Sequence, residues 1–137
     1  MRLKVKLIGS DWAASCQLVT YLRGRGYEVA LLEEPEDCPV YHGKNCSRKC
    51  SCREVLMIEQ YLTTQDALDY VLELSRKCPG SIENVAVFAS ILSPDELVTA
   101  IELGCKVMFK PVLPQEVEKW LVELEKSSES VPELRKA

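Results

Sequence analysis

Long apolar runs are absent from this 137-residue sequence, which contains no stretch of eighteen or more consecutive apolar residues. A helix that crosses a bilayer needs about 20 such residues, so we expect no membrane-spanning segment and no membrane partner. The N-terminal residues 1–9 have too short an apolar part for a secretory signal and no small-residue cleavage site. We therefore expect a cytoplasmic protein.

An excess of positive charge is also absent, because 21 Asp and Glu outnumber 17 Lys and Arg, for a net charge of -4. Proteins bind the phosphate backbone of nucleic acids chiefly through an excess of Lys and Arg. The composition therefore argues against nucleic acid as the main partner and favours a protein partner.

The sequence shows no linker, no internal repeat and no separate output domain. A content of 47% hydrophobic and 28% charged residues is typical of one globular domain with a single core. We expect residues 1–126 to form that domain. Residues 127–137 are polar, rich in serine and interrupted by a proline, which predicts a flexible tail.

Short apolar runs alternate with helical periods along the chain, which predicts five strands separated by helices. The strands are expected at residues 4–8, 27–32, 55–58, 85–88 and 106–109. Gly24 and Gly26 should end the first helix, and a helix from Thr63 or Thr64 should end before Pro79. Ser93 begins a capping box with proline at the first helical position, and its helix should end at Gly104. Pro114 should open the last helix.

This alternation predicts an α/β fold, with one five-stranded parallel sheet covered by helices on both faces. In doubly wound sheets the binding site lies beyond the carboxyl ends of the strands. The residues expected at that edge are Gly9, Ser10, Asp11, Glu59, Ala89, Ser90 and Lys110.

The segment VMFKPVLPQEVEKWL, residues 107–121, resembles the corresponding part of response regulator receiver (CheY-like) domains. A Lys-Pro pair after an apolar strand, followed by a capped final helix, carries the resemblance, which extends from residue 4 to about 124 apart from residues 34–54. The resemblance implies a flavodoxin-like strand order of 2-1-3-4-5 and a cis bond between Lys110 and Pro111. It also implies two-component signal transduction, with a histidine kinase or another signalling protein as partner.

The resemblance places the family's reactive positions on residues that do not suit them. Family members accept a phosphoryl group on an Asp that ends the third strand, and that Asp shares a metal ion with an acidic pair ending the first strand. Here Glu59 stands at the acceptor position, while Gly9 and Ser10 replace the acidic pair, with Asp11 one place further on. Phosphoryl transfer needs a divalent cation, which usually takes two or three carboxylates. We therefore expect a pseudo-receiver that is not phosphorylated, with no catalytic residue.

Four further residues complete the expected receiver-like site. Family members carry a hydroxyl residue after the fourth strand, and that position falls on Ala89 or Ser90 here. The Lys110-Pro111 pair after the fifth strand is retained. Glu59 paired with Lys110 could imitate a phosphorylated Asp, or the pair could be a structural salt bridge. The structural interpretation is favoured because partly buried ion pairs are often only structural.

Residues 34–54 stand where the second helix is expected, and they contain the cysteine-rich stretch CPVYHGKNCSRKCSC. Its cysteines are spaced as Cys38-x7-Cys46-x3-Cys50-x-Cys52. Four thiolates can hold one tetrahedral zinc at about 2.3 Å, and such a site would order a segment with few apolar residues. An iron–sulfur cluster, free thiols or a disulfide-forming redox switch are the alternatives. His42 is left out of the ligand set because four cysteines already complete a structural zinc site.

The remaining cysteines, Cys16, Cys78 and Cys105, are at apolar positions and are predicted to be core or near-core residues. Trp12 and Trp120 are expected in the core as well.

Two functional classes follow. The first is a non-catalytic signalling module that docks a protein through residues 90–104 and the fifth strand. The second is a metal- or redox-sensing domain, and a phospho-accepting regulator is a weaker third possibility.

Overall fold

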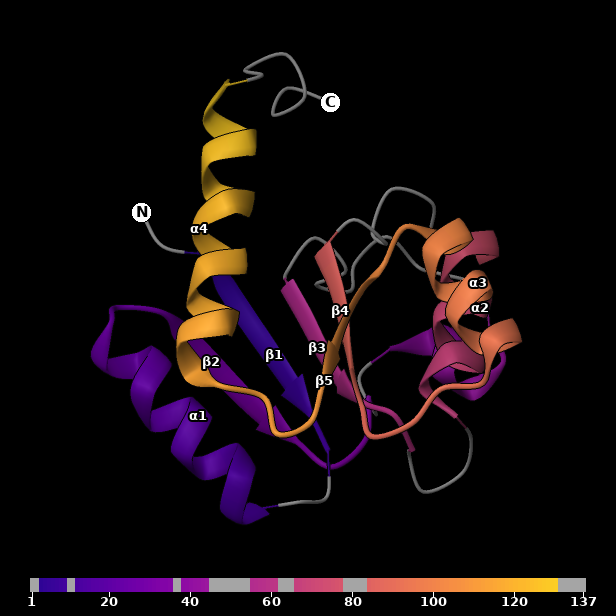
Figure 1. The fold of residues 1–137 in the computed structure, drawn as a ribbon, viewed down its shortest axis with the longest axis horizontal. Coiled ribbons are helices and arrows are strands. Elements are labelled where there is room, and N and C mark those ends of the chain that lie inside the picture. The colour runs from indigo at the N-terminus through magenta and orange to yellow at the C-terminus, as the bar shows by residue number, and fades with distance from the viewer. Residues whose placement is uncertain are drawn as a thin grey trace.

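The computed structural model describes residues 3–9, 12–35, 38–44, 55–61, 66–77 and 84–130. Its centre is a five-stranded parallel sheet with the order β2-β1-β3-β4-β5 (Figure 1). The strands are β1 (Lys4–Ile8), β2 (Glu28–Leu32), β3 (Val55–Glu59), β4 (Val85–Ala89) and β5 (Lys106–Phe109). The predicted fold class and strand order are therefore confirmed, and the strand bounds agree with the predicted ones to within one residue.

The strands at the centre of the sheet are the most apolar. All five residues of β4, VAVFA, are buried, as are four of the five in β3, VLMIE. Strands covered on both faces need such continuous apolar sequences. The edge strands β2 and β5, in contrast, each contain exposed as well as buried residues. The apolar runs of the sequence thus determine which strands lie in the middle.

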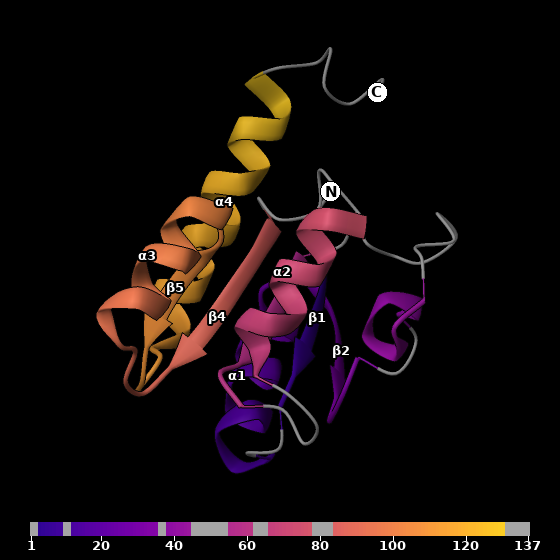
Figure 2. The ribbon, with the colours of Figure 1, turned by 90° about the vertical axis from the view of Figure 1, so that its right-hand side faces the viewer.

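Helices cover both faces of the sheet (Figures 1 and 2). One face carries α1 (Trp12–Gly24) and α4 (Pro114–Ser130), whose Leu22 and Leu121 are fully buried in one core cluster. The other face carries α2 (Ala67–Lys77), α3 (Pro94–Leu103) and the short 3-10 helix η1 (Pro39–His42). A right-handed crossover between neighbouring parallel strands produces this two-sided arrangement.

Helix α3 has the capping that the sequence predicts. The Ser93 hydroxyl accepts a hydrogen bond from the Glu96 amide, and the Glu96 carboxylate accepts one from the Ser93 amide, at 3.2 and 3.0 Å. At the other end Gly104 has a φ of 83°, a left-handed conformation that glycine adopts readily. These caps fix both ends of the helix that follows β4.

Several sequence-based expectations need correction or lie outside the described residues. Cys16 is exposed on α1, so its prediction as a core or near-core residue was wrong. The described buried residues of α1 are Ser15, Leu18, Val19 and Leu22. Cys16 lies about 100° further round the helix than Ser15, on the flank of this stripe. Trp120 is buried as predicted, whereas Cys78 and the side chain of Trp12 lie outside the described part of the chain.

Helix α4 continues to Ser130 and so includes the first four residues of the segment predicted as a tail. No proline or glycine interrupts the sequence until Pro132, which explains why the helix extends past residue 126. Residues 131–137 lie outside the described residues. Among the helices that the structure describes, none is both long and apolar enough to cross a membrane.

Candidate functional site at the carboxyl edge of the sheet

Four of the predicted site residues meet where the parallel strands end. Gly9 follows β1, Glu59 ends β3, Ala89 ends β4 and Lys110 follows β5. The register brings Glu59 beside Phe88 and Ala89 beside Phe109. The Lys110 amide donates to the Ala89 carbonyl at 2.8 Å, so the last strand holds its lysine at this edge.

Glu59 and Lys110 form an ion pair. The Glu59 side chain is only 10% exposed, and that of Lys110 is 35% exposed. A carboxylate in such a buried position needs a charged or hydrogen-bonding partner, because desolvation without one is costly. Lys110 supplies that partner from the end of β5, across the intervening strand β4.

Glycine at position 9 makes room for this carboxylate. A Cβ atom on residue 9 would overlap Glu59 Cγ and would lie 3.2 Å from both Glu59 Cβ and Glu59 Cδ. The Glu59 side chain therefore lies directly against the backbone of Gly9, in space that any larger residue would need. Gly9 and Glu59 are a matched pair, and the acidic side chain that the family resemblance implies at position 9 would collide with Glu59.

Some of the remaining predicted site residues can be placed in the structure, and two lie outside the described residues. Ala89 is fully buried and has no hydroxyl, while Ser90 is exposed just beyond the strand. The bond between Lys110 and Pro111 is cis, as the family resemblance implies. Ser10 and Asp11 lie outside the described residues.

Sequence reasoning missed Gln60, which is only 4% exposed and stands next to Glu59. Its Nε2 donates to the Ile91 carbonyl at 2.6 Å, and its Oε1 accepts from the Ser90 amide at 3.0 Å. Buried amides are almost always hydrogen-bonded. A polar residue directly after a buried strand was the signal in the sequence that could have pointed to it.

A group of exposed apolar side chains comes from one stretch of the chain. Of the seven large hydrophobic residues recorded as exposed in the described ranges, six fall between positions 91 and 113, and the seventh is Tyr61. We name these six the α3–β5 surface: Ile91, Leu97, Val98, Ile101, Phe109 and Leu113. They come from the segment before α3, from α3 itself, from β5 and from the segment before α4. This is the part of the chain predicted to dock a partner.

Only one of the four predicted metal ligands can be placed. Cys38 is 8% exposed and belongs to an apolar cluster with Ile8, Val40 and Ile58. Cys46, Cys50 and Cys52 lie outside the described residues. Within the described ranges, no group of three His, Cys, Asp or Glu residues could hold a metal ion.

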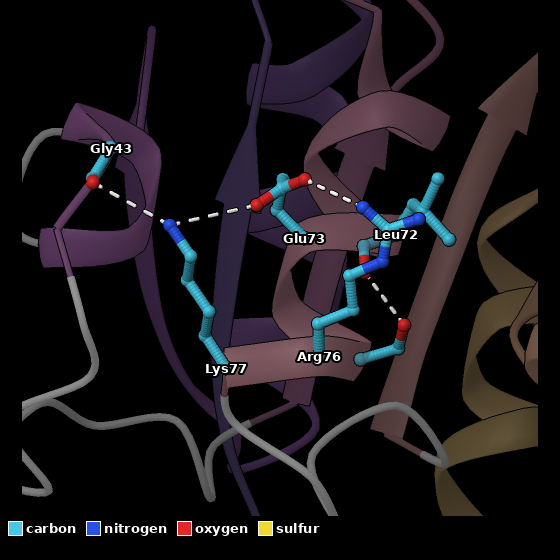
Figure 3. Close-up of polar contacts among 6 residues, drawn as sticks. Gly43, Leu72, Glu73, Arg76 and Lys77 are labelled. Carbon is cyan, nitrogen blue, oxygen red and sulfur yellow. Dashed lines mark hydrogen bonds and ion pairs between the residues drawn. The ribbon is translucent and has the colours of Figure 1, made fainter.

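The beginning of the cysteine-rich segment is attached to α2 (Figure 3). Lys77 Nζ donates to the Gly43 carbonyl at 3.4 Å and lies 3.6 Å from a Glu73 carboxylate oxygen. The rings of Tyr41 and Tyr70 meet edge to face, with their centroids 5.6 Å apart. Residues 38–44 are therefore packed against α2 and stand where the sequence was expected to form a second α-helix.

Cys105 is the other buried cysteine of the described residues. Burial raises the pKa of the Cys105 thiol above its ordinary value, and a backbone hydrogen bond offsets this only in part. Its Sγ donates to the Ala100 carbonyl at 3.5 Å. A thiol that stays protonated is a poor nucleophile and a poor metal ligand, so Cys105 packs as a small apolar residue.

The chain matches no protein-family model, and no curated protein matches it significantly. Solved structures do resemble it. The receiver domain of a Francisella response regulator is 14% identical, with a TM-score of 0.72 over 93% of this chain and 99% of that one. A CheY-like receiver domain protein from Methanospirillum hungatei is 16% identical, with a TM-score of 0.66 over 99% of this chain and 98% of that one.

A third similar structure is the receiver domain of a sensor histidine kinase from Pseudomonas aeruginosa. It is 15% identical, with a TM-score of 0.66 over 88% of this chain and 95% of that one, and it has a magnesium ion coordinated in its active-site cleft. At these identities the likeness concerns the fold. The chain has the CheY-like fold of response regulator receiver domains, with a glycine, a glutamate and a lysine packed together at the carboxyl edge of its sheet.

Proposed function

We propose that this chain is a non-catalytic signalling module that uses the receiver fold without accepting a phosphoryl group, and that it acts by docking a protein partner. The single observation that carries the proposal is the position of Glu59. Its side chain fills the space against Gly9 and is ion-paired with Lys110.

Chemistry supports the absence of phosphorylation. A divalent cation that neutralises phosphate oxygens usually binds two or three carboxylates, and Gly9 supplies none. Glu59 is longer by one methylene than the aspartate that the family uses, and its charge is already compensated by Lys110. The positive charge of Lys110 beside Glu59 disfavours the binding of a second cation at this carboxylate.

The α3–β5 surface supports the docking role. Isolated exposed apolar residues are ordinary, but six exposed large apolar side chains within one stretch of the chain, three of them on α3, favour an interaction site. Helix α3 bears Asp95, Glu96 and Glu102 and has no basic residue. We therefore propose a protein partner whose contact surface is apolar and bordered by Lys or Arg, since such a surface complements both features.

Substitutions on the α3–β5 surface test the docking role. The wild-type chain is used to isolate a partner from its source cells, and that protein is then purified and titrated by calorimetry. Val98→Lys and Ile101→Lys should each weaken binding at least tenfold. Gln17→Lys, at an exposed position of α1, is the control and should leave binding unchanged. Unchanged binding by both surface variants, or binding that requires a phosphodonor, would contradict the proposal. Self-association of the chain in place of a separate partner would contradict it as well.

We also propose that Cys38, Cys46, Cys50 and Cys52 bind one zinc ion, with an iron–sulfur cluster as the alternative. The density of thiols within fifteen residues supports this, together with the attachment of residues 38–44 to α2. Metal binding by such thiolates contributes folding free energy, and Cys38 is already held in an apolar cluster. In that case the segment adds a metal-dependent element to the signalling module.

A further inference from the structure

From the contacts of Gln60 we infer that it is a positioning residue, which holds the segment between β4 and α3 so that the α3–β5 surface has a fixed form. The inference rests on the proposed docking function for its consequence, but its structural part can be tested alone. Gln60 belongs neither to the ion pair nor to the docking surface, and it lies between them.

The backbone of Gln60 joins three elements. Its amide donates to the Phe88 carbonyl of β4 at 2.8 Å, and its carbonyl accepts from the Ala67 amide at the start of α2, also at 2.8 Å. The preceding residue, Glu59, is ion-paired with Lys110 beyond β5. The position of Gln60 is therefore fixed before its side chain makes any contact.

The side chain then fastens the next segment in two directions. Oε1 accepts from the Ser90 amide, and Nε2 donates to the Ile91 carbonyl, at 3.0 and 2.6 Å. One partner is a donor and the other an acceptor, so only one orientation of the amide satisfies both. A carboxylate or an apolar side chain at position 60 could not make the same two bonds.

These two bonds act on the residues that present the docking surface. Ile91 is 79% exposed, the most exposed large apolar residue recorded in the described ranges, and Gln60 holds its carbonyl inward. Two residues later Ser93 caps α3, which carries Leu97, Val98 and Ile101. Because residues 90–93 belong to no helix or strand, side-chain hydrogen bonds have a large share in holding them. Gln60 thus connects the filled receiver-like site to the surface that we propose for docking.

Hydrogen exchange and methyl relaxation of the full chain, measured by NMR, test this role without a partner. Gln60→Met keeps the length and removes both bonds. The Ser90 amide should exchange about tenfold faster, while the Val87 amide inside β4 keeps its rate. The Ile91 methyl group should become more mobile. Gln115→Met, on an exposed position of α4, should change none of these values.

A second variant separates the two bonds and remains informative if Gln60→Met fails to fold. Gln60→Glu can still accept from the Ser90 amide but, when ionised, cannot donate to Ile91. Ser90 should stay protected and the Ile91 methyl group should gain mobility. Unchanged Ser90 and Ile91 values in folded Gln60→Met, or equal acceleration at Val87, would overturn the inference. Loss of Ser90 protection in Gln60→Glu would overturn it too. Failure of the surface substitutions to affect partner binding would instead count against the proposed function.

Discussion

The side chain of Glu59 lies against the backbone of Gly9, so closely that a Cβ atom on residue 9 would overlap Glu59 Cγ. Neither residue alone explains the site. Glycine leaves the space, glutamate fills it, and Lys110 neutralises the buried charge. At this edge of the sheet, these three residues form one packed and charge-compensated group.

Gly9→Ala should destabilise the protein by about 1–3 kcal/mol, because the new methyl group overpacks a buried position. Urea unfolding followed by circular dichroism measures the change. The cost should largely disappear in the Glu59→Ala background, where the space is free. An equal cost in both backgrounds would mean that the methyl group collides with something other than Glu59.

Lys110→Met should destabilise the wild-type chain, because it leaves a buried carboxylate without its charged partner. In a Glu59→Gln background the same substitution should cost about 1–2 kcal/mol less. The double-mutant cycle, measured by urea unfolding, gives this coupling energy directly. A coupling energy near zero would show that the ion pair contributes nothing to the folded state.

Thiol labelling should distinguish Cys16 from Cys105. Cys16 is exposed and should react quickly with an alkylating reagent in the native protein. Cys105 is buried with a raised pKa, so its thiolate is scarce and its labelling should need unfolding. Peptide mass spectrometry after timed labelling reads both sites, and fast native labelling of Cys105 would contradict its burial.

The raised pKa of Cys105 also predicts a pH dependence of stability. The unfolded chain loses the Cys105 proton at a lower pH than the folded chain does. Folding stability from this thiol is therefore complete below the ordinary thiol pKa of 9.0 and decreases as the pH rises above it. The free energy of unfolding, measured with urea from about pH 8 to about pH 10, should therefore decrease less in Cys105→Ala than in the wild-type chain. An identical decrease in the variant would exclude Cys105 as the cause.

Metal analysis of protein purified without air should give about one metal centre per chain if the cysteine-rich segment binds zinc or an iron–sulfur cluster. Replacing Cys46 or Cys50 with Ser should abolish the metal, because each supplies one of four ligands. Cys16→Ser and Cys105→Ser are the matched controls and should retain it. A wild-type chain whose thiols all titrate as free would refute the metal centre, and treatment with a mild oxidant would then reveal whether a disulfide forms.

The fold could be predicted because its signals are local. Apolar runs such as VAVFA, the capping box at Ser93 and the glycine at position 104 each report on a few neighbouring residues, and the structure has all three as expected. Val19 and Leu22 are buried as their spacing predicts, but Cys16 lies about 100° further round the helix than the buried Ser15, so spacing alone did not show that it falls on the flank of the buried stripe. Gly9 was identified as a site position, but its steric match with Glu59 depends on the distance between two strand ends.

Gln60 and the α3–β5 surface illustrate the same limit. The contacts of Gln60 span about thirty positions of sequence, which no local pattern reveals. Leu97 and Ile101 have the spacing of a buried helical stripe, yet both are exposed because Ala100 provides the contact with the core. Burial of such residues is decided by the layer packed against them, and it follows only from the assembled fold.

Intact-mass measurement after incubation with a phosphodonor tests the central claim most directly. The wild-type chain, treated with acetyl phosphate or phosphoramidate and magnesium, should gain no phosphoryl group, because Glu59 is paired with Lys110 and Gly9 offers no carboxylate to a metal. Glu59→Asp should gain none either, since the metal ligands are still missing. A stoichiometric gain of one phosphoryl group by the wild-type chain, removed by hydroxylamine, would contradict the account.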